Sequence, residues 1–151
     1  MNKLSKSQNP NLENPKRPGL GFWAFGIWDF FAGRLRSFRH AFTGWRYVLR
    51  TQRNAWIHAL ISTAVFVVGL WVGLERQEWA IILLTMVVVW MGEFINTALE
   101  AVVDLASPDA HPLAKVGKDV GAAAVLIAAL AAVLIGLLIL GPPLWEKIYG
   151  Y

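Results

Sequence analysis

The hydrophobic positions of the chain gather into three long apolar runs, at about residues 55–74, 79–105 and 120–140. Each run is close to or above the ~20 residues that a helix needs to cross the hydrocarbon core of a bilayer. The short polar connection at 75–78 predicts a turn, and the proline-containing segment at 106–115 predicts a polar loop. The pattern therefore predicts an all-α integral membrane protein with three transmembrane helices.

Aromatic residues and arginines alternate in the segment that precedes the first run. If this segment is helical from Arg34 on, Arg39, Arg46, Arg50 and Arg53 fall within roughly 60° of one another. A basic stripe of this kind predicts an amphipathic helix on the membrane surface, with its arginines toward the lipid headgroups. Nucleic-acid binding is the alternative interpretation, but the stripe directly adjoins a membrane span, which favours the lipid surface.

Composition agrees with a membrane protein and suggests how the chain is oriented. Hydrophobic residues make up 56% of the 151 residues and charged residues only 16%, which is too apolar for an ordinary soluble domain. Ten of the fourteen Lys and Arg precede the first run, and Lys115 and Lys118 flank the second loop. By the positive-inside rule, the N-terminus and this loop should be cytoplasmic. We expect a disordered cytoplasmic tail over 1–21 and a single membrane domain over 22–151.

Polar residues interrupt the second apolar run at helical spacing. From Glu93, a helix places Asn96 at about −60°, Glu100 at about −20° and Asp104 at about +20°, so all four share one face. A charge at membrane depth costs at least ~3 kcal/mol on insertion scales and usually indicates function. The alternative is a polar stripe that holds helices together, a role that Asn can fill.

The two glutamates of this stripe differ in depth. Glu100 lies about 10 Å from Glu93 along a helix axis, so an adjacent acid pair is not expected. Lys118 and Asp119 begin the third run, where Lys suits phosphate and Asp could orient it or help to hold a divalent ion. The alternative for this pair is ordinary interfacial charge with a snorkelling side chain.

Several other chemistries find no support in the sequence. Walker A and Gly-rich kinase loops are absent, as is zinc-binding His spacing, and the chain has no cysteine for thiol or disulfide chemistry. Taken alone, His111 is most simply a surface histidine. Two other classes stay open on these grounds: a small ion-coupled transporter with Glu93 as the ion relay, and a non-catalytic membrane subunit.

Longer stretches of the chain resemble a known family. The stretches are Gly44-Trp-Arg46-Tyr, Thr51-Gln52-Arg53-Asn54-Ala-Trp-Ile-His58, Glu93-Phe-Ile-Asn96-Thr97-Ala98-Leu99-Glu100-Ala101-Val102-Val103-Asp104 and His111-Pro-Leu-Ala-Lys-Val-Gly-Lys118-Asp119. They resemble the prokaryotic diacylglycerol kinase family, small membrane kinases that act on diacylglycerol or undecaprenol. The resemblance covers about residues 36–140, and the Arg-Asn-x-x-Ile-His run is more similar to the undecaprenol kinase branch.

The resemblance implies a homotrimer in the bacterial inner (cytoplasmic) membrane, with active sites shared between subunits. It implies transfer of the ATP γ-phosphoryl to a lipid alcohol with Mg²⁺ as cofactor. Undecaprenol is the expected alcohol, diacylglycerol is the alternative, and no nucleic-acid partner is expected.

The resemblance also implies roles for individual residues. Glu93 would be the general base, Asn96 would support it and the substrate, Ala122 would lie near the lipid, and Glu100 would bind the metal. The residues implied for the nucleotide are His40, Gln52, Glu100, Asp109, Ala110, His111, Lys118 and Asp119. Gln52 stands where the family often has a second metal-binding Glu. An amide offers a neutral oxygen, so it would hold Mg²⁺ less tightly than a carboxylate.

Overall fold

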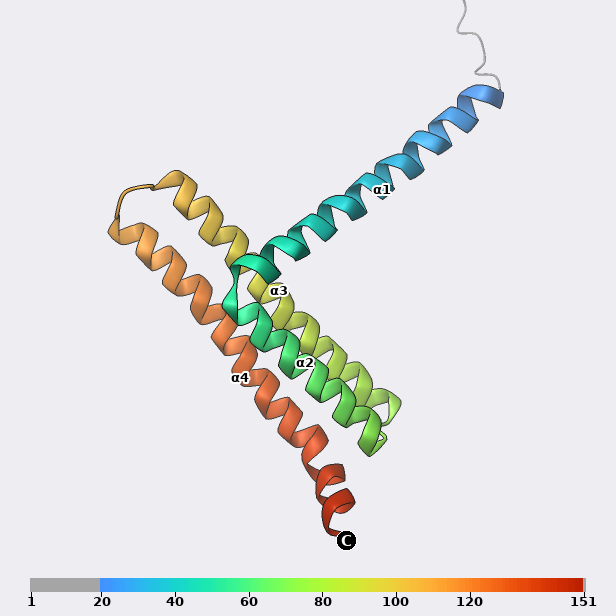
Figure 1. The fold of residues 1–151 in the computed structure, drawn as a ribbon, viewed down its shortest axis with the longest axis vertical. Helices are drawn as coiled ribbons and strands as arrows, with labels where there is room; N and C mark the ends of the chain where they lie inside the picture. Colours follow the sequence, from blue (N-terminus) through green and yellow to red (C-terminus); the bar gives the residue numbers. More distant parts are fainter. Residues whose placement is uncertain (1–19, 151) are drawn as a thin grey trace, which may run out of the picture. The chain divides into compact units, whose positions relative to one another are not determined.

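The computed structural model describes residues 20–150, which leaves most of the expected N-terminal tail outside the described residues. The described chain is helical: α1 spans Leu20–Thr51, α2 Arg53–Val72, α3 Arg76–Ala106 and α4 Pro112–Tyr149 (Figure 1). Of these, α2, α3 and α4 are long and apolar enough to cross a membrane. For residues 20–150, the predictions of an all-α fold and of three helices long and apolar enough to span a membrane are confirmed.

The chain divides into two compact units, one ending at Thr43 and the other comprising Gly44–Tyr151. The first unit contains most of α1, where the Arg34 guanidinium lies 4.8 Å from the centre of the Phe30 ring. Phe38 and Phe42 are exposed in this unit. The amphipathic membrane-surface role of α1 stays a prediction. The second unit carries the last two turns of α1 and the three apolar helices, and it is described on its own below.

A tight turn joins α2 to α3. Gly73 ends α2 with a φ of 82°, a left-handed conformation that glycine adopts readily. A Cβ on Gly69 would lie 2.9 Å from the Trp79 ring, so the glycine lets the two helices close on each other. Glu75 and Glu78 form a reciprocal capping box, so α3 begins at Arg76, inside the segment predicted as a turn.

The loop between α3 and α4 is shorter than predicted, because α4 already begins at Pro112. Proline suits the first turn of a helix, since its missing N–H would have no partner there. His111 caps this helix: its Nδ1 accepts a hydrogen bond from the Leu113 backbone N–H at 3.2 Å. At the opposite end, Pro142 and Pro143 remove two backbone donors, and the axis of α4 bends there (Figure 1).

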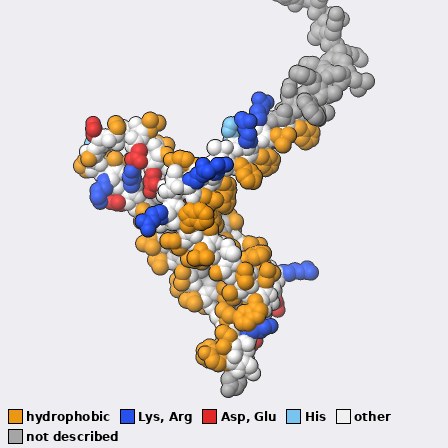
Figure 2. Space-filling model, in the orientation of Figure 1, with side chains coloured by type: hydrophobic (Ala, Val, Ile, Leu, Met, Phe, Trp, Pro, Cys, Tyr) orange, Lys and Arg blue, Asp and Glu red, His pale blue; other side chains and the backbone are white. Residues whose placement is uncertain are grey.

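Helices α3 and α4 form the main packing interface of the second unit, and α2 packs less extensively against both. The few buried apolar side chains belong to this packing: Val48, Ala55, Ile82, Val89, Val125 and Leu140. Large hydrophobic side chains cover most of the outside of the helices, as a lipid-facing surface requires. Charged side chains gather instead at the end of the α3–α4 pair that carries the connecting loop (Figure 2).

Candidate functional site

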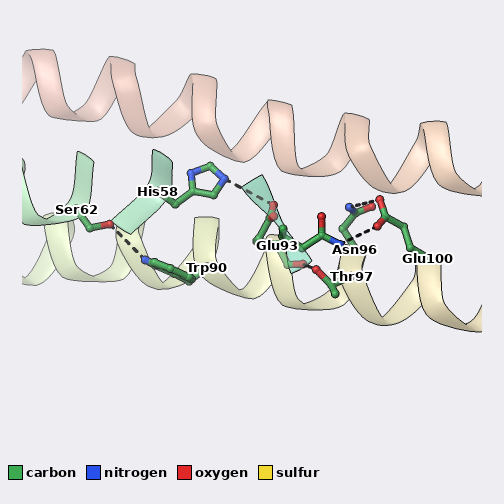
Figure 3. A network of polar contacts seen from close by, with 8 residues as sticks. His58, Ser62, Trp90, Glu93, Asn96, Thr97 and Glu100 are labelled. Carbon is green, nitrogen blue, oxygen red and sulfur yellow. Dashed lines mark hydrogen bonds and ion pairs between the residues drawn. The ribbon is translucent and has the colours of Figure 1, made fainter. Parts of the chain in front are cut away.

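The polar stripe on α3 passes from the buried interior of the unit to its charged end. Glu93 is 1% exposed, and Asn96 and Thr97 are also buried. Glu100 is half-buried, and Asp104 is exposed. Figure 3 shows this sequence of side chains along α3, with two residues of α2 facing it. The stripe is therefore graded in burial, in the order expected for a group that acts within the membrane and groups that act nearer water.

Two amides hold the Glu100 carboxylate. Gln52 Nε2 donates to Glu100 Oε2 and Asn96 Nδ2 donates to Glu100 Oε1, each at 3.0 Å. Gln52 is the single extended residue between α1 and α2, with φ −102° and ψ 117°. This interruption between the two helices places the Gln52 side chain against Glu100 of α3, which lies 48 residues later in the sequence. Both carboxylate oxygens have a donor, which fixes the orientation of Glu100.

The surroundings of Glu93 are less well satisfied. Glu93 Oε2 lies 3.7 Å from His58 Nε2, and both atoms are buried without a hydrogen-bond partner. Asn96 Oδ1 is a third buried oxygen without a partner. The Thr97 hydroxyl donates to the Glu93 backbone carbonyl at 2.8 Å and so leaves the carboxylate free. Buried polar atoms are normally paired, so this group of unpaired atoms is a candidate binding site.

Aromatic side chains enclose this part of α3. The Trp45 ring, from the last turns of α1, lies 4.9 Å from the Trp90 ring and 5.0 Å from the Phe94 ring, measured between centres. Trp90 Nε1 in turn donates to Ser62 Oγ of α2 at 3.3 Å (Figure 3). The end of α1, α2 and α3 are thus joined at the level of Glu93.

A cavity of about 430 Å³ opens among α2, α3 and α4 next to this site. Aliphatic side chains form most of its wall, with small residues such as Ala129, Ala132 and Gly136 on α4. His58 and Ser62 are among its few polar lining residues. The volume lies within the ~300–1,000 Å³ typical of small-molecule sites. His58 therefore belongs both to the cavity wall and to the Glu93 site.

At the charged end, one ion pair joins α3 to α4 and another lies within α4. Lys118 of α4 pairs with Asp104 of α3, and Lys115 Nζ lies 2.8 Å from Asp119 Oδ2 one turn along α4. The Lys118 and Asp119 side chains expected to bind a nucleotide are thus available near water, each held by a partner of opposite charge.

Several other predicted site residues of the second unit have no side-chain hydrogen bond or ion pair to Gln52, Asn96 or Glu100. Asp109 and Ala110 are exposed in the α3–α4 loop, where the Ser107 hydroxyl donates to the Asp109 carbonyl oxygen. Ala122 is exposed on α4, next to the Gly121 that lies against Asn96. His40 belongs to the other compact unit. Within the second unit, hydrogen bonds join Gln52 and Asn96 to Glu100, and the metal, nucleotide and substrate roles expected for these residues stay predictions.

Sequence reasoning passed over two residues that shape the site. His58 has no predicted role beyond its place in a family stretch, although an ionisable residue within a span is itself a signal of function. Gly121 has no predicted role. A Cβ there would collide with Asn96 Oδ1, so this glycine makes room for the buried amide.

These features define a helical membrane protein with a graded row of carboxylates along one internal face. Residues 39–140 match the family model described as prokaryotic diacylglycerol kinase. The chain belongs to the prokaryotic diacylglycerol kinase family. It is a lipid kinase, and its bacterial relatives include diacylglycerol kinases and an undecaprenol kinase.

Three relatives show the range of similarity. A diacylglycerol kinase of Synechocystis sp. is 44% identical over 118 residues, 78% of this chain and 67% of the relative. An undecaprenol kinase of Bacillus subtilis is 43% identical over 109 residues, 72% of this chain and 89% of the relative. A diacylglycerol kinase of Escherichia coli is 30% identical over 95 residues, 58% of this chain and 78% of the relative.

Proposed function

We propose that this lipid kinase transfers the γ-phosphoryl of ATP to the hydroxyl of undecaprenol. The observation that carries the proposal is the Glu93 carboxylate, which is buried beside an apolar cavity and has an oxygen without a hydrogen-bond partner. The same helix carries this carboxylate and, two turns away, the half-buried Glu100 toward the charged end. Lipid and nucleotide can therefore approach one helix from opposite directions.

Glu93 acts as the general base in this proposal. Its Oε2 takes the proton of the lipid hydroxyl while the hydroxyl oxygen bonds to the γ-phosphorus, the bond from that phosphorus to the bridging oxygen breaks, and ADP leaves. Phosphoryl transfer asks little covalent chemistry of a protein and depends on positioning and charge stabilisation. Asn96 positions the base and the substrate in this proposal. Its amide nitrogen donates to Glu100, which holds the side chain, and its oxygen has no partner and is free for the substrate.

The charged end of the α3–α4 pair binds the nucleotide in this proposal. The Lys118 ammonium is a donor suited to phosphate oxygens, and Asp119 orients it or its neighbours. The exposed α3–α4 loop lines the nucleotide through Asp109, Ala110 and His111, and His40 is a further residue proposed to bind it. The His111 ring already caps α4 through Nδ1, which leaves Nε2 to meet a ligand.

Magnesium fits the donor set around Glu100. Among residues 20–150, no group of three or more His, Asp or Glu side chains is placed to hold a metal. Mg²⁺ needs no such cage, because it commonly takes one or two carboxylates together with substrate phosphates and water. Glu100 would hold the ion, and an amide rotation would offer it the Gln52 oxygen. When bound, Mg²⁺ supplies charge neutralisation for the phosphates.

The choice of undecaprenol over diacylglycerol rests on two supports. The Bacillus subtilis undecaprenol kinase aligns over 89% of its own length, more than the 67% of the Synechocystis diacylglycerol kinase. The cavity beside His58 is a single apolar space that suits one hydrocarbon chain. Ala122, exposed on α4, adds a small apolar contact for the same lipid. Diacylglycerol is the alternative substrate.

Location and assembly complete the proposal. We place the protein in the bacterial cytoplasmic membrane with its N-terminus and α3–α4 loop in the cytoplasm, where ATP is found. A single membrane domain spans 22–151 in this proposal. Three spans alone shield several buried polar groups poorly from lipid, which supports a homotrimer. In this assembly α1 lies on the membrane surface and the subunits share active sites.

Labelled ATP tests the function directly. Purified protein is incubated with Mg²⁺ and either undecaprenol or diacylglycerol, and labelled lipid is measured. We expect undecaprenol to be phosphorylated faster, and Glu93→Gln to reduce the rate by about 10²–10⁴-fold, the usual contribution of a general base. The variant should insert and assemble normally. Near-normal turnover in Glu93→Gln would refute the base role, and a faster reaction with diacylglycerol would reverse the substrate assignment.

A further inference from the structure

His58 is an ionisable residue placed where α2 faces the buried end of the polar stripe. Its side chain is 13% exposed and that of Glu93 only 2%, and the facing atoms are 3.7 Å apart (Figure 3). Neither His58 Nε2 nor Glu93 Oε2 has a hydrogen-bond partner. A buried polar atom without a partner costs about 1–3 kcal/mol, and more when it is charged. Two such atoms facing each other therefore need an explanation.

Neighbouring side chains do not supply the missing partner. The Trp90 N–H is directed to Ser62, and the Thr97 hydroxyl is directed to the Glu93 backbone. The amide nitrogen of Asn96 is directed to Glu100. These nearby donors are directed to other acceptors, which leaves the imidazole facing the free oxygen of the carboxylate.

The imidazole is itself held in place. Its ring lies 6.3 Å from the Trp90 ring between centres, edge toward face at 64°. Trp90 is tied to Ser62, one turn beyond His58 on the same helix, at 3.3 Å. The hydrogen bond between Trp90 of α3 and Ser62 of α2 thus helps to fix the imidazole beside Glu93. A group whose function depends on orientation requires this kind of support.

We propose that His58 is a positioning residue for Glu93, which rests on the base role proposed above. Nε2–H faces Glu93 Oε2 and holds the carboxylate in the orientation from which it takes the lipid hydroxyl proton. The 3.7 Å separation exceeds the 2.7–3.2 Å of an N–H···O hydrogen bond. Catalytic hydrogen bonds are often long without substrate and shorten in the substrate complex.

Kinetics provide the first test. His58→Leu removes the donor, and His58→Gln restores an N–H at similar reach. We expect kcat to fall on the order of 10–100-fold in His58→Leu, the range seen for partners that orient a functional ligand. The KM values for lipid and ATP should stay within about twofold, and His58→Gln should recover most of kcat. Unchanged kcat in His58→Leu, or a loss confined to the KM for lipid, would overturn the positioning role.

Infrared spectroscopy of the protein without substrate provides the second test. The carboxyl absorption of Glu93 is assigned by its loss in Glu93→Gln. We expect this absorption to shift in His58→Leu and to return toward its original position in His58→Gln. Thr63→Val is the matched control, because Thr63 lies exposed on the same helix with its hydroxyl bonded to the Ala59 carbonyl. An absorption that is the same in His58→Leu and in the original protein would refute the contact.

The two tests separate failure of this inference from failure of the proposed function. If the original protein phosphorylates no lipid alcohol, the proposed function is lost, and the infrared result alone decides whether His58 orients Glu93. If lipid phosphorylation is normal and His58→Leu changes neither kcat nor the infrared absorption, the function stands and the role of His58 is lost.

Discussion

Asn96 lies at the tightest approach between α3 and α4 around the site. Its nitrogen is bound to Glu100, and its buried oxygen lies against the backbone of α4 at Gly121, where no side chain could fit. The amide can hold this position because residue 121 has no Cβ. The position of the Asn96 amide therefore depends on a residue that has no side chain.

We predict that Gly121→Ala impairs phosphoryl transfer severely. The added methyl would displace Asn96, and overpacking of this kind costs ~1–3 kcal/mol, or about 10–100-fold in rate when it falls on the site. The steady-state rate of lipid phosphorylation measures this effect. Gly117→Ala is the matched control one turn away, because its Cβ would meet Val103 at an ordinary 3.7 Å. Equal activity in both variants would contradict the role of the close approach.

Gln52 is the residue at which the chain departs from the expected metal ligands. We predict that Gln52→Glu lowers the Mg²⁺ concentration needed for half-maximal activity by about 3–10-fold, because a second carboxylate binds this ion more strongly than an amide. Without Mg²⁺, the same variant should be less stable to heat, since two carboxylates would then repel each other. A Mg²⁺ titration and a melting curve measure the two effects. An unchanged titration would show that residue 52 is not a ligand.

Most of the structural features that the sequence predicted lie in α3. Its apolar length and the spacing of Glu93, Asn96 and Glu100 predicted a spanning helix with one polar face, and the observed gradient of burial follows that face. Helix boundaries were less predictable. The capping box at Glu75 and Glu78 extends α3 into the expected turn, because local side-chain hydrogen bonds outweighed the polar character of the segment.

Contacts between helices could not be read from the periodicity of any one of them. The hydrogen bond of Gln52 to Glu100 joins residues 48 positions apart, and it depends on the single non-helical residue between α1 and α2. The approach of His58 to Glu93 depends in the same way on how α2 packs against α3. The helical spacing within α3 is a local property, whereas these pairings follow from tertiary packing.

The ion pair between Asp104 and Lys118 links α3 to α4 at their charged ends. Its side chains are 65% and 39% exposed, so its contribution should be small. We predict that Asp104→Asn raises the KM for ATP by about 1.4–5-fold, which corresponds to the 0.2–1 kcal/mol of exposed pairs. If Asp104 acts by holding Lys118, the substitution should have no further effect in a Lys118→Met background. Independent effects of the two substitutions on KM would contradict this.

At the scale of the whole molecule, the charge distribution determines how the chain enters the membrane. Charged side chains gather at the α3–α4 loop end (Figure 2), and the opposite ends of the apolar helices carry Glu75, Arg76, Glu78, Glu146 and Lys147. The chain contains no cysteine, so single cysteines can report on each side without removing native ones. This makes orientation a measurable property of the full protein.

We predict that Ser107→Cys is labelled by a membrane-impermeant maleimide only after cells are opened. Ser107 lies in the α3–α4 loop, which the positive-inside rule assigns to the cytoplasm. Gln77→Cys, in the exposed first turn of α3, should react in intact spheroplasts and is the matched variant on the other side. The reverse pattern of labelling would invert the proposed topology.

Because Glu93 and Glu100 lie on one continuous helix, an insertion or deletion between them would change their relative positions. Inserting a single residue between them would turn Glu93 by about 100° away from its partners and shift it ~1.5 Å along the axis. Such a change could not keep both the approach of His58 to Glu93 and the hydrogen bond of Gln52 to Glu100. Insertions and deletions should therefore be tolerated in the N-terminal tail or the α3–α4 loop and rejected throughout 93–104. If Glu93 meets the lipid and Glu100 the nucleotide, as proposed, the number of residues between them in α3 sets the distance between the two substrates.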